Sequence, residues 1–209
     1  MSVLNQLASA NASHSDVPNQ ELAKSLAESR DLAGIKELAD NLQNKNKDIA
    51  SDCIKTLYEI GYLNPELIQE HVDSFLKILH SRNNRLVWGG MIALSTIADK
   101  KSREIFGQFG FIAEQLKNGS IITVDNAVLV LAKISAVNKD YEKAIFPILL
   151  QHLKGYMARQ IPQHAEKTLW AVNPDNREPF IGTLEGRMNE MTPSQASRLK
   201  KVIRAAQKR

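Results

Sequence analysis

Five histidines and one cysteine are the side chains of this 209-residue chain most suited to metal binding or catalysis. The histidines are His14, His71, His80, His152 and His164. A zinc site needs ligands at short spacings, such as two histidines four residues apart on a helix or histidines partnered by cysteines. Neither pattern occurs here. We therefore predict no metal site and no bound cofactor.

Nucleophilic and phosphate-binding motifs are missing as well. No base can be paired with Cys53, which we expect to be a buried small hydrophobic residue. The segment FGQFGF (106–111) has two glycines but lacks the Lys-Ser or Lys-Thr of a phosphate-binding loop. No serine lies at a turn between a strand and a helix. We predict no catalytic residues and a protein that is not an enzyme.

The segment NNRLVWGGMIALSTIAD (83–99) combines a tryptophan with two adjacent glycines in an otherwise helical pattern. Each glycine costs about 1 kcal/mol relative to alanine inside a helix. Some close approach must therefore favour Gly89 and Gly90. The elements around them decide whether that approach is core packing or a binding surface.

Composition and charge restrict the class of protein. The chain is 43% hydrophobic and 24% charged, as is ordinary for a globular protein. Apolar runs such as AVLVLA (127–132) are too short to cross a bilayer, and MSVLNQLASANAS lacks the features of a signal peptide. A single cysteine fits a reducing compartment. We expect a cytoplasmic protein with no membrane partner.

The formal charge of +4 is unevenly distributed. From Arg187 onward there are seven basic residues and one acid, a charge of +6, so residues 1–186 carry −2. The basic character belongs to the C-terminal end of the chain.

Apolar residues recur with a period of about 37 residues, which indicates an internal repeat. One set of columns has the i, i+3, i+7 spacing of a helix face. Its members are Ile35, Leu38 and Leu42, then Val72, Phe75 and Leu79, then Phe109, Ile112 and Leu116, then Phe146, Leu149 and Leu153, and finally Ile181, Leu184 and Met188.

A second set of columns follows in every repeat. Its large residues are Leu57, Leu94, Leu131, Leu169 and Ile203. Four residues earlier stand mostly small residues, namely Cys53, Gly90, Ala127, Ala165 and Leu199. Each repeat is thus predicted to be a pair of amphipathic helices, and Gly90 is explained by close packing in the small-residue column.

Tandem helix pairs of this kind resemble HEAT and armadillo-type repeats. The resemblance implies an all-α fold, a right-handed α-solenoid of about five HEAT-like helix pairs with an N-terminal capping helix. We expect residues 1–30 to form a flexible N-terminus plus the capping helix, and residues 31–209 to form the repeat array.

The second helices should line the concave surface of such an array. Counted from each Leu57-type residue, positions −9, −5, −2 and +2 lie opposite the core stripe. In repeats two and three, Gly89, Ile92 and Leu129 occupy positions of this face where the other repeats are polar or charged, and Trp88 lies at their edge. The C-terminal half of the face is basic. The predicted partner-binding groove consists of Trp88, Gly89, Ile92, Leu129, His164, Lys167, Arg198 and Lys201.

An apolar patch that includes a tryptophan favours a non-enzymatic scaffold that binds a protein or peptide segment, with an apolar anchor followed by acidic residues. In a second interpretation Trp88 is a wedge between repeats, while Trp170 is expected to pack in the core. The alternative function is that of a DNA-binding HEAT-like protein, similar to alkylation-repair glycosylases. Lys55, Arg85, Lys133, Lys167, Lys201 and Arg204 would then contact phosphates. Self-association into a homo-oligomer through the apolar patch is a third alternative.

Overall fold

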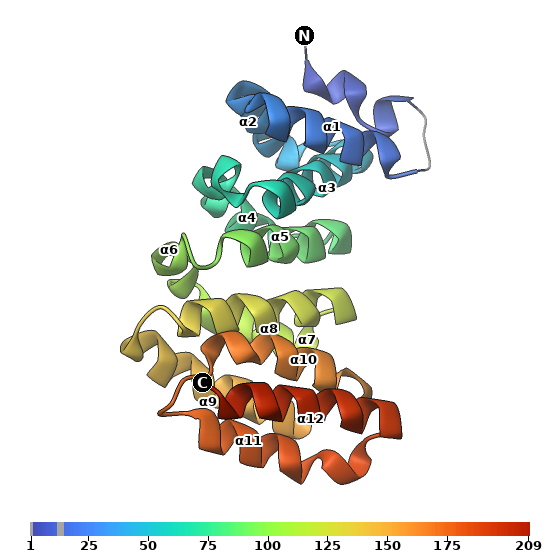
Figure 1. Ribbon diagram of the computed structural model, residues 1–209. Helices are drawn as coiled ribbons and strands as arrows, with labels where there is room; N and C mark the ends of the chain where they lie inside the picture. The colour runs from blue at the N-terminus through green and yellow to red at the C-terminus, as the bar shows by residue number, and fades with distance from the viewer. Residues whose placement is uncertain (1, 12–14) are drawn as a thin grey trace. The chain divides into compact units, whose positions relative to one another are not determined.

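A computed structural model describes residues 2–11 and 15–209 (Figure 1). His14 lies outside the described residues. About 80% of the chain is helical, and no strand occurs in the described part. Within that part, no helix has the length and apolar character needed to cross a membrane. The predicted all-α fold is confirmed.

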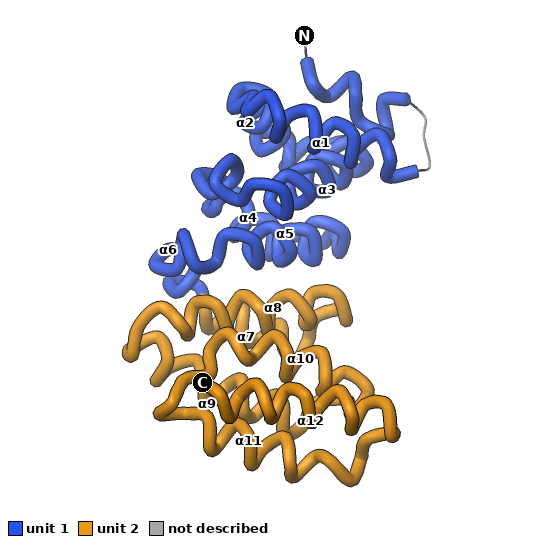
Figure 2. The backbone as a smooth tube through the Cα atoms, viewed as in Figure 1, with its two compact units in different colours: residues 1–108 blue, residues 109–209 orange. Residues whose placement is uncertain are grey.

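The chain divides into two compact units, residues 1–108 and residues 109–209 (Figure 2). Unit 1 contains α1 (Val17–Ser29), α2 (Leu32–Asp40), α3 (Lys47–Leu63), α4 (Val72–Ile78), α5 (Asn84–Ile97) and α6 (Ser102–Phe106). Unit 2 contains α7 (Phe109–Asn118), α8 (Ile121–Ser135), α9 (Lys139–Gly155), α10 (Ile161–Thr168), α11 (Arg177–Gly186) and α12 (Pro193–Gln207).

Short 3-10 helices join or extend these elements. They are η1 (Val3–Gln6), η2 (Ser9–Asn11), η3 (Asn41–Gln43), η4 (Pro65–Leu67), η5 (Gln69–His71), η6 (Ala158–Gln160), η7 (Leu169–Ala171) and η8 (Met188–Glu190).

Consecutive helices pack in pairs, and the pairs stack within each unit. In unit 1, α2 packs on α3 and α4 on α5, while α1, α3 and α5 form a row of second helices. In unit 2, α7 packs on α8, α9 on α10 and α11 on α12, while α8, α10 and α12 form the equivalent row. A helix in such a row has neighbours on several sides, so only a narrow stripe of it reaches solvent.

The repeating apolar columns form the core of both units. Leu57, Leu94 and Leu131 are fully buried in the second helices. Of the fifteen first-helix residues in the repeat pattern, only Phe109 and Met188 are half-buried, and the rest are buried. Burial of this apolar surface, at roughly 25 cal/mol per Å², is the main favourable term in stacking the pairs.

Asparagine, serine and threonine side chains begin most of the second helices. The Asn46 side chain accepts a hydrogen bond from the backbone N–H of Asp48, and Ser120 accepts one from Thr123. Thr192 forms a capping box with Gln195, with a proline following as predicted. These caps satisfy N–H groups that have no partner inside the helix.

The first residues of the chain are packed against unit 1. Leu7 and Ala8 are buried, and the backbone N–H of Ala8 donates to Asn19 Oδ1 at 2.9 Å. The backbone N–H of Ser9 donates to Asp52 Oδ2 at 2.7 Å. For residues 2–11 the expected flexible start is therefore wrong, because their apolar side chains and backbone donors find partners on α1 and α3.

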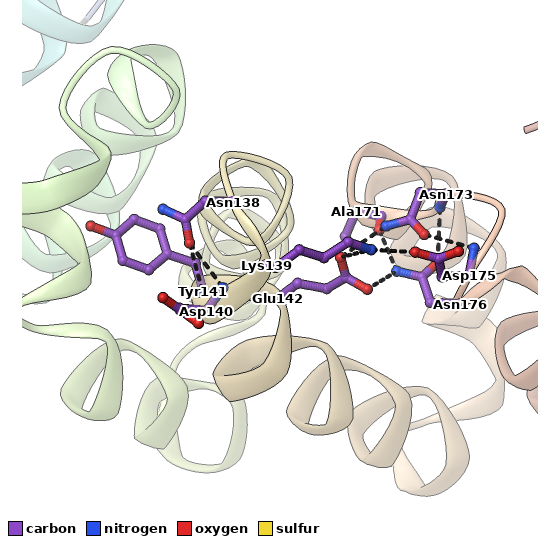
Figure 3. Close-up of polar contacts among 9 residues, drawn as sticks. All are labelled: Asn138, Lys139, Asp140, Tyr141, Glu142, Ala171, Asn173, Asp175 and Asn176. Atoms are coloured by element: carbon purple, nitrogen blue, oxygen red, sulfur yellow. Dashed lines mark hydrogen bonds and ion pairs between the residues drawn. The ribbon is translucent and has the colours of Figure 1, made fainter.

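A polar network ties the first turn of α9 to a loop in unit 2 (Figure 3). The Glu142 carboxylate accepts hydrogen bonds from Asn173 Nδ2 at 2.9 Å and from Asn176 Nδ2 at 3.0 Å. Lys139 reaches Asp175 Oδ2 at 2.5 Å and Glu142 Oε2 at 3.2 Å. The network holds the start of α9 against the loop that precedes α11.

Candidate binding face of the second helices

The solvent-facing stripe of the second helices departs from the predicted stripe mainly at position −5, whereas positions −2 and +2 are half-exposed or exposed in four of the five repeats each. In α5, α8 and α10 the residue at position −5 is buried, whereas the residue at −6 is half-exposed. Trp88, Asp125 and Gln163 hold position −6 in these helices, so they lie on the face. In α5 the residue at position −5, Gly89, turns toward the neighbouring second helix α3.

Gly89 is buried, and its lack of a side chain serves helix packing. A Cβ built at position 89 would lie 2.8 Å from Ile54 Cγ1 on α3. One built at Gly90 would lie 2.9 Å from Ile78 Cγ1 and 3.2 Å from the Phe75 carbonyl oxygen. The explanation predicted for Gly90 is consistent with these contacts. The placement of Gly89 in an open groove is wrong, because the glycine lets α5 approach α3.

Ile92 is also not available at the surface, since it is only 7% exposed. Trp88 is half-buried, with its ring centroid 6.1 Å from that of Tyr58 on α3. Tyr58 in turn packs against Tyr62, which is 59% exposed, at a centroid distance of 6.0 Å. Trp88 thus bridges two successive second helices, as in the wedge interpretation, while one edge of the aromatic cluster remains at the surface.

Asp125 organises the part of the face between α8 and α10 in unit 2. Its carboxylate accepts a hydrogen bond from Gln163 Nε2 at 2.6 Å and pairs with Lys167 Nζ at 2.5 Å. Lys167 also donates to the Asp125 carbonyl oxygen at 2.9 Å. The charge of Lys167 is therefore largely neutralised by Asp125. Leu129, one helical turn further along α8, is half-exposed as predicted.

His164 is buried, with 1% of its surface exposed, so the prediction that it contributes a basic group to the groove is wrong. Its Nδ1 shares a hydrogen bond with His152 Nε2 at 2.9 Å, and the Tyr156 ring packs against both imidazoles. Burial lowers the pKa of each histidine to about 4, aided for His152 by the adjacent His164. Both rings are uncharged near neutral pH.

Arg198 and Lys201, the remaining predicted basic residues, lie on α12 and are exposed. Arg198 forms a two-pronged pair with the Glu166 carboxylate, at 2.5 Å for each nitrogen. Lys201 has no carboxylate within 4.0 Å among the described residues. Of the four basic residues predicted for the groove, only Lys201 keeps an unneutralised charge at the surface.

Trp170 is the largest exposed apolar side chain of unit 2, although the sequence pattern predicts a core position for it. It is 55% exposed, and Lys133 Nζ lies 5.3 Å from its ring centroid. The expected core position is wrong because α10 ends at Thr168 and η7 begins at Leu169. A 3-10 turn has three residues per turn, so the 3.6-residue periodicity no longer places side chains there.

The described residues contain no group of three or more His, Cys, Asp or Glu side chains that could hold a metal ion. Cys53 is fully buried, and burial raises its pKa to about 12, which keeps the thiol protonated. The second-helix face therefore offers a partner aromatic contacts, at Trp88 and Trp170, and charged contacts, as at Lys201.

Comparisons with solved structures match repeat proteins over most of the chain. A crystal structure of an engineered protein matches with a TM-score of 0.68 and 17% identity, over 100% of this chain and 98% of that one. A designed armadillo repeat protein in complex with the peptide (KR)4 matches with a TM-score of 0.66 and 15% identity, over 90% of this chain and 85% of that one.

Computationally designed armadillo repeat proteins for modular peptide recognition match with a TM-score of 0.66 and 16% identity, over 88% of this chain and 86% of the other. No protein-family model matches the sequence, and the comparison with curated proteins gives no significant match. On the strength of its helix pairs and these structural matches, the chain has an armadillo/HEAT-type helical repeat fold.

Proposed function

We propose that this protein is a non-enzymatic scaffold that binds a peptide or protein segment on the face of its second helices. The observation that carries the proposal is the exposure of Trp170 beside Lys133 on this face in unit 2. Tryptophan is the residue type most often found as a binding hot spot, and its large exposed ring gains most from being covered.

The structural neighbours support a peptide as the occupant. One is a designed armadillo repeat protein in complex with the peptide (KR)4, and others were designed for modular peptide recognition. Their identity to this chain is 15–16%, so they support the kind of partner and leave its sequence open.

The charges on α12 favour a partner with acidic residues. Lys201 is exposed and unpaired among the described residues, and Arg204 is exposed on the same helix. An aromatic or aliphatic residue placed against Trp170 and followed by acidic residues would complement this surface.

A selection from a random peptide display library tests the proposal, followed by fluorescence anisotropy on the selected peptides. We expect Trp170→Ala to weaken binding by about 2 kcal/mol, as for a buried hot spot. Met157→Ala is the matched control, because Met157 is also an exposed apolar residue of unit 2, 42% exposed, in the loop after α9. In Trp88→Phe, the remaining tryptophan reports binding directly through its fluorescence.

Four outcomes would contradict the proposal. The first two are the absence of any selected binder, and binders that respond equally to the Trp170 and Met157 changes. The third is duplex-DNA binding that collapses between 50 and 200 mM salt and ignores Trp170, which would favour the DNA-binding alternative. The fourth is a dimer in sedimentation experiments that Trp170→Ala dissociates.

A further inference from the structure

Unit 1 contains a cavity of about 750 Å³ where the loops that precede α3 and α5 lie together. Its apolar lining includes Leu42, Ile78 and Leu86, which are at most 7% exposed and belong to the core. The volume falls within the range of small-molecule sites, roughly 300–1,000 Å³. None of the residues predicted for the peptide groove lines it.

The charge of this cavity differs from that of the unit around it. Lys45, Lys47, Lys77 and Arg82 line it together with His80, and no aspartate or glutamate does. Unit 1 as a whole has 12 lysines and arginines against 14 aspartates and glutamates, a formal charge of −2. Four cations are thus gathered in one place within an acidic unit.

The lysines of unit 1 separate into two groups by their partners. Five lie outside the cavity, and each has a carboxylate within 4.0 Å, namely Lys24, Lys36, Lys55, Lys100 and Lys101. Lys45, Lys47 and Lys77 line the cavity, and none of them has such a partner among the described residues. A bound anion would complement these positive charges, which have no carboxylate partner.

We propose that this cavity binds a phosphorylated small molecule of nucleotide size. The planar or apolar body would lie against the apolar part of the lining, and the phosphates would lie among the lysines and Arg82. Lysine acts as a point charge toward phosphate, whereas arginine can offer two parallel N–H donors. The site requires both parts of the ligand, because its floor is apolar and its rim is cationic.

Isothermal titration calorimetry with ATP and with inorganic tripolyphosphate tests the proposal. Both are used in the presence of EDTA so that no metal ion masks the phosphates. We expect ATP to bind, and tripolyphosphate to bind several-fold more weakly because it has no body to cover the apolar floor. The double change Lys45→Gln/Lys77→Gln should weaken ATP binding at least tenfold.

The matched control is Lys24→Gln/Lys36→Gln, which removes the same charge from exposed lysines of unit 1. We expect it to change ATP affinity less than twofold. Equal losses in the two double variants would overturn the proposal, because binding would then follow net charge. Failure of ATP to bind the wild-type chain, or equal affinities for ATP and tripolyphosphate, would also overturn it. Tighter binding of a short DNA duplex, sensitive to the same two lysines, would show that the cavity contacts a nucleic-acid backbone instead.

Discussion

Gly89 and Gly90 occupy helical positions where a methyl group has little room. Ile54 on α3 lies against position 89, and Ile78 and the Phe75 carbonyl lie against position 90. The intrinsic cost of two glycines in a helix is about 2 kcal/mol. Close contact of α5 with both α3 and α4 offsets this cost, since protein interiors gain from dense packing.

Gly89→Ala should destabilise the protein by about 1–2 kcal/mol, because the overpacking cost exceeds the gain in helix propensity. Gly182→Ala is the matched control, since Gly182 lies inside α11 with nothing within 4 Å of its built Cβ. There we expect a gain of up to about 1 kcal/mol. Urea unfolding measures both changes.

A double change isolates the contact itself. Ile54→Ala removes the atoms that the new methyl group would meet, so Gly89→Ala should cost less in that background. Stabilisation by Gly89→Ala in the wild-type background would mean that position 89 is open to solvent.

A buried arginine joins α9 and α11, the first helices of two successive pairs. Arg187, just after α11, is 8% exposed, and its Nη1 donates to the carbonyl oxygens of Leu153 at 2.6 Å and Lys154 at 2.9 Å. Its Nη2 donates to the Tyr156 carbonyl at 2.9 Å, and the guanidinium pairs with Glu190. One side chain thus satisfies carbonyls at the end of α9 that have no partner inside the helix.

Arg187→Leu should reduce the free energy of unfolding by about 3 kcal/mol, since it leaves these carbonyls and Glu190 without their donor. Arg187→Lys should recover only part of the loss, because an ammonium cannot reproduce the planar fork. Arg198→Leu is the control. It removes an exposed pair with Glu166, which should contribute less than about 1 kcal/mol. Comparable losses for Arg187→Leu and Arg198→Leu in urea unfolding would show that Arg187 does not stabilise the contact between α9 and α11 in this way.

The charge balance of the whole chain hides local differences that affect its response to pH. Unit 1 carries −2 and unit 2 carries +6, and the unfolded chain exposes every group to water. His164 is buried and His152 half-buried within unit 2, where Asp125 of α8, Tyr156 just after α9 and Lys167 of α10 surround His164. These histidines take up protons more readily in the unfolded chain than in the folded one.

The free energy of unfolding should have its full value above pH 6.5 and should fall as the pH is lowered toward 4. Burial places the pKa of each histidine at about 4, below the value of 6.5 for an unfolded chain, so protons favour the unfolded state. We expect each of the two histidines to contribute a loss of up to about 2 kcal/mol between pH 7.5 and 5.0. Urea unfolding at both pH values measures it.

The double variant His152→Gln/His164→Gln controls for other titrating groups. Its stability should depend less on pH over the same interval, whatever its stability at pH 7.5. An undiminished pH dependence in this variant would show that other groups cause the loss.

The repeat fold could be predicted from the sequence because the apolar residues that form the core recur at a regular spacing along the chain. Columns such as Leu57, Leu94 and Leu131 report a helix periodicity and a repeat period, and both are local properties of the order of residues. The caps at Ser120 and Thr192 are equally local. Helix type, pairing and the absence of a catalytic motif follow from such patterns.

The exposed surface depended on contacts between residues far apart in the sequence. A single helix cannot show that position 89 meets Ile54, that His164 meets His152, or that Arg198 meets Glu166. Several neighbouring helices determine which residues of a second helix are buried. A prediction that assumes one buried stripe per helix therefore finds too few of them. The cationic cavity arises in the same way, because Lys45 in the loop before α3 and Lys77 at the end of α4 come together only in the tertiary structure.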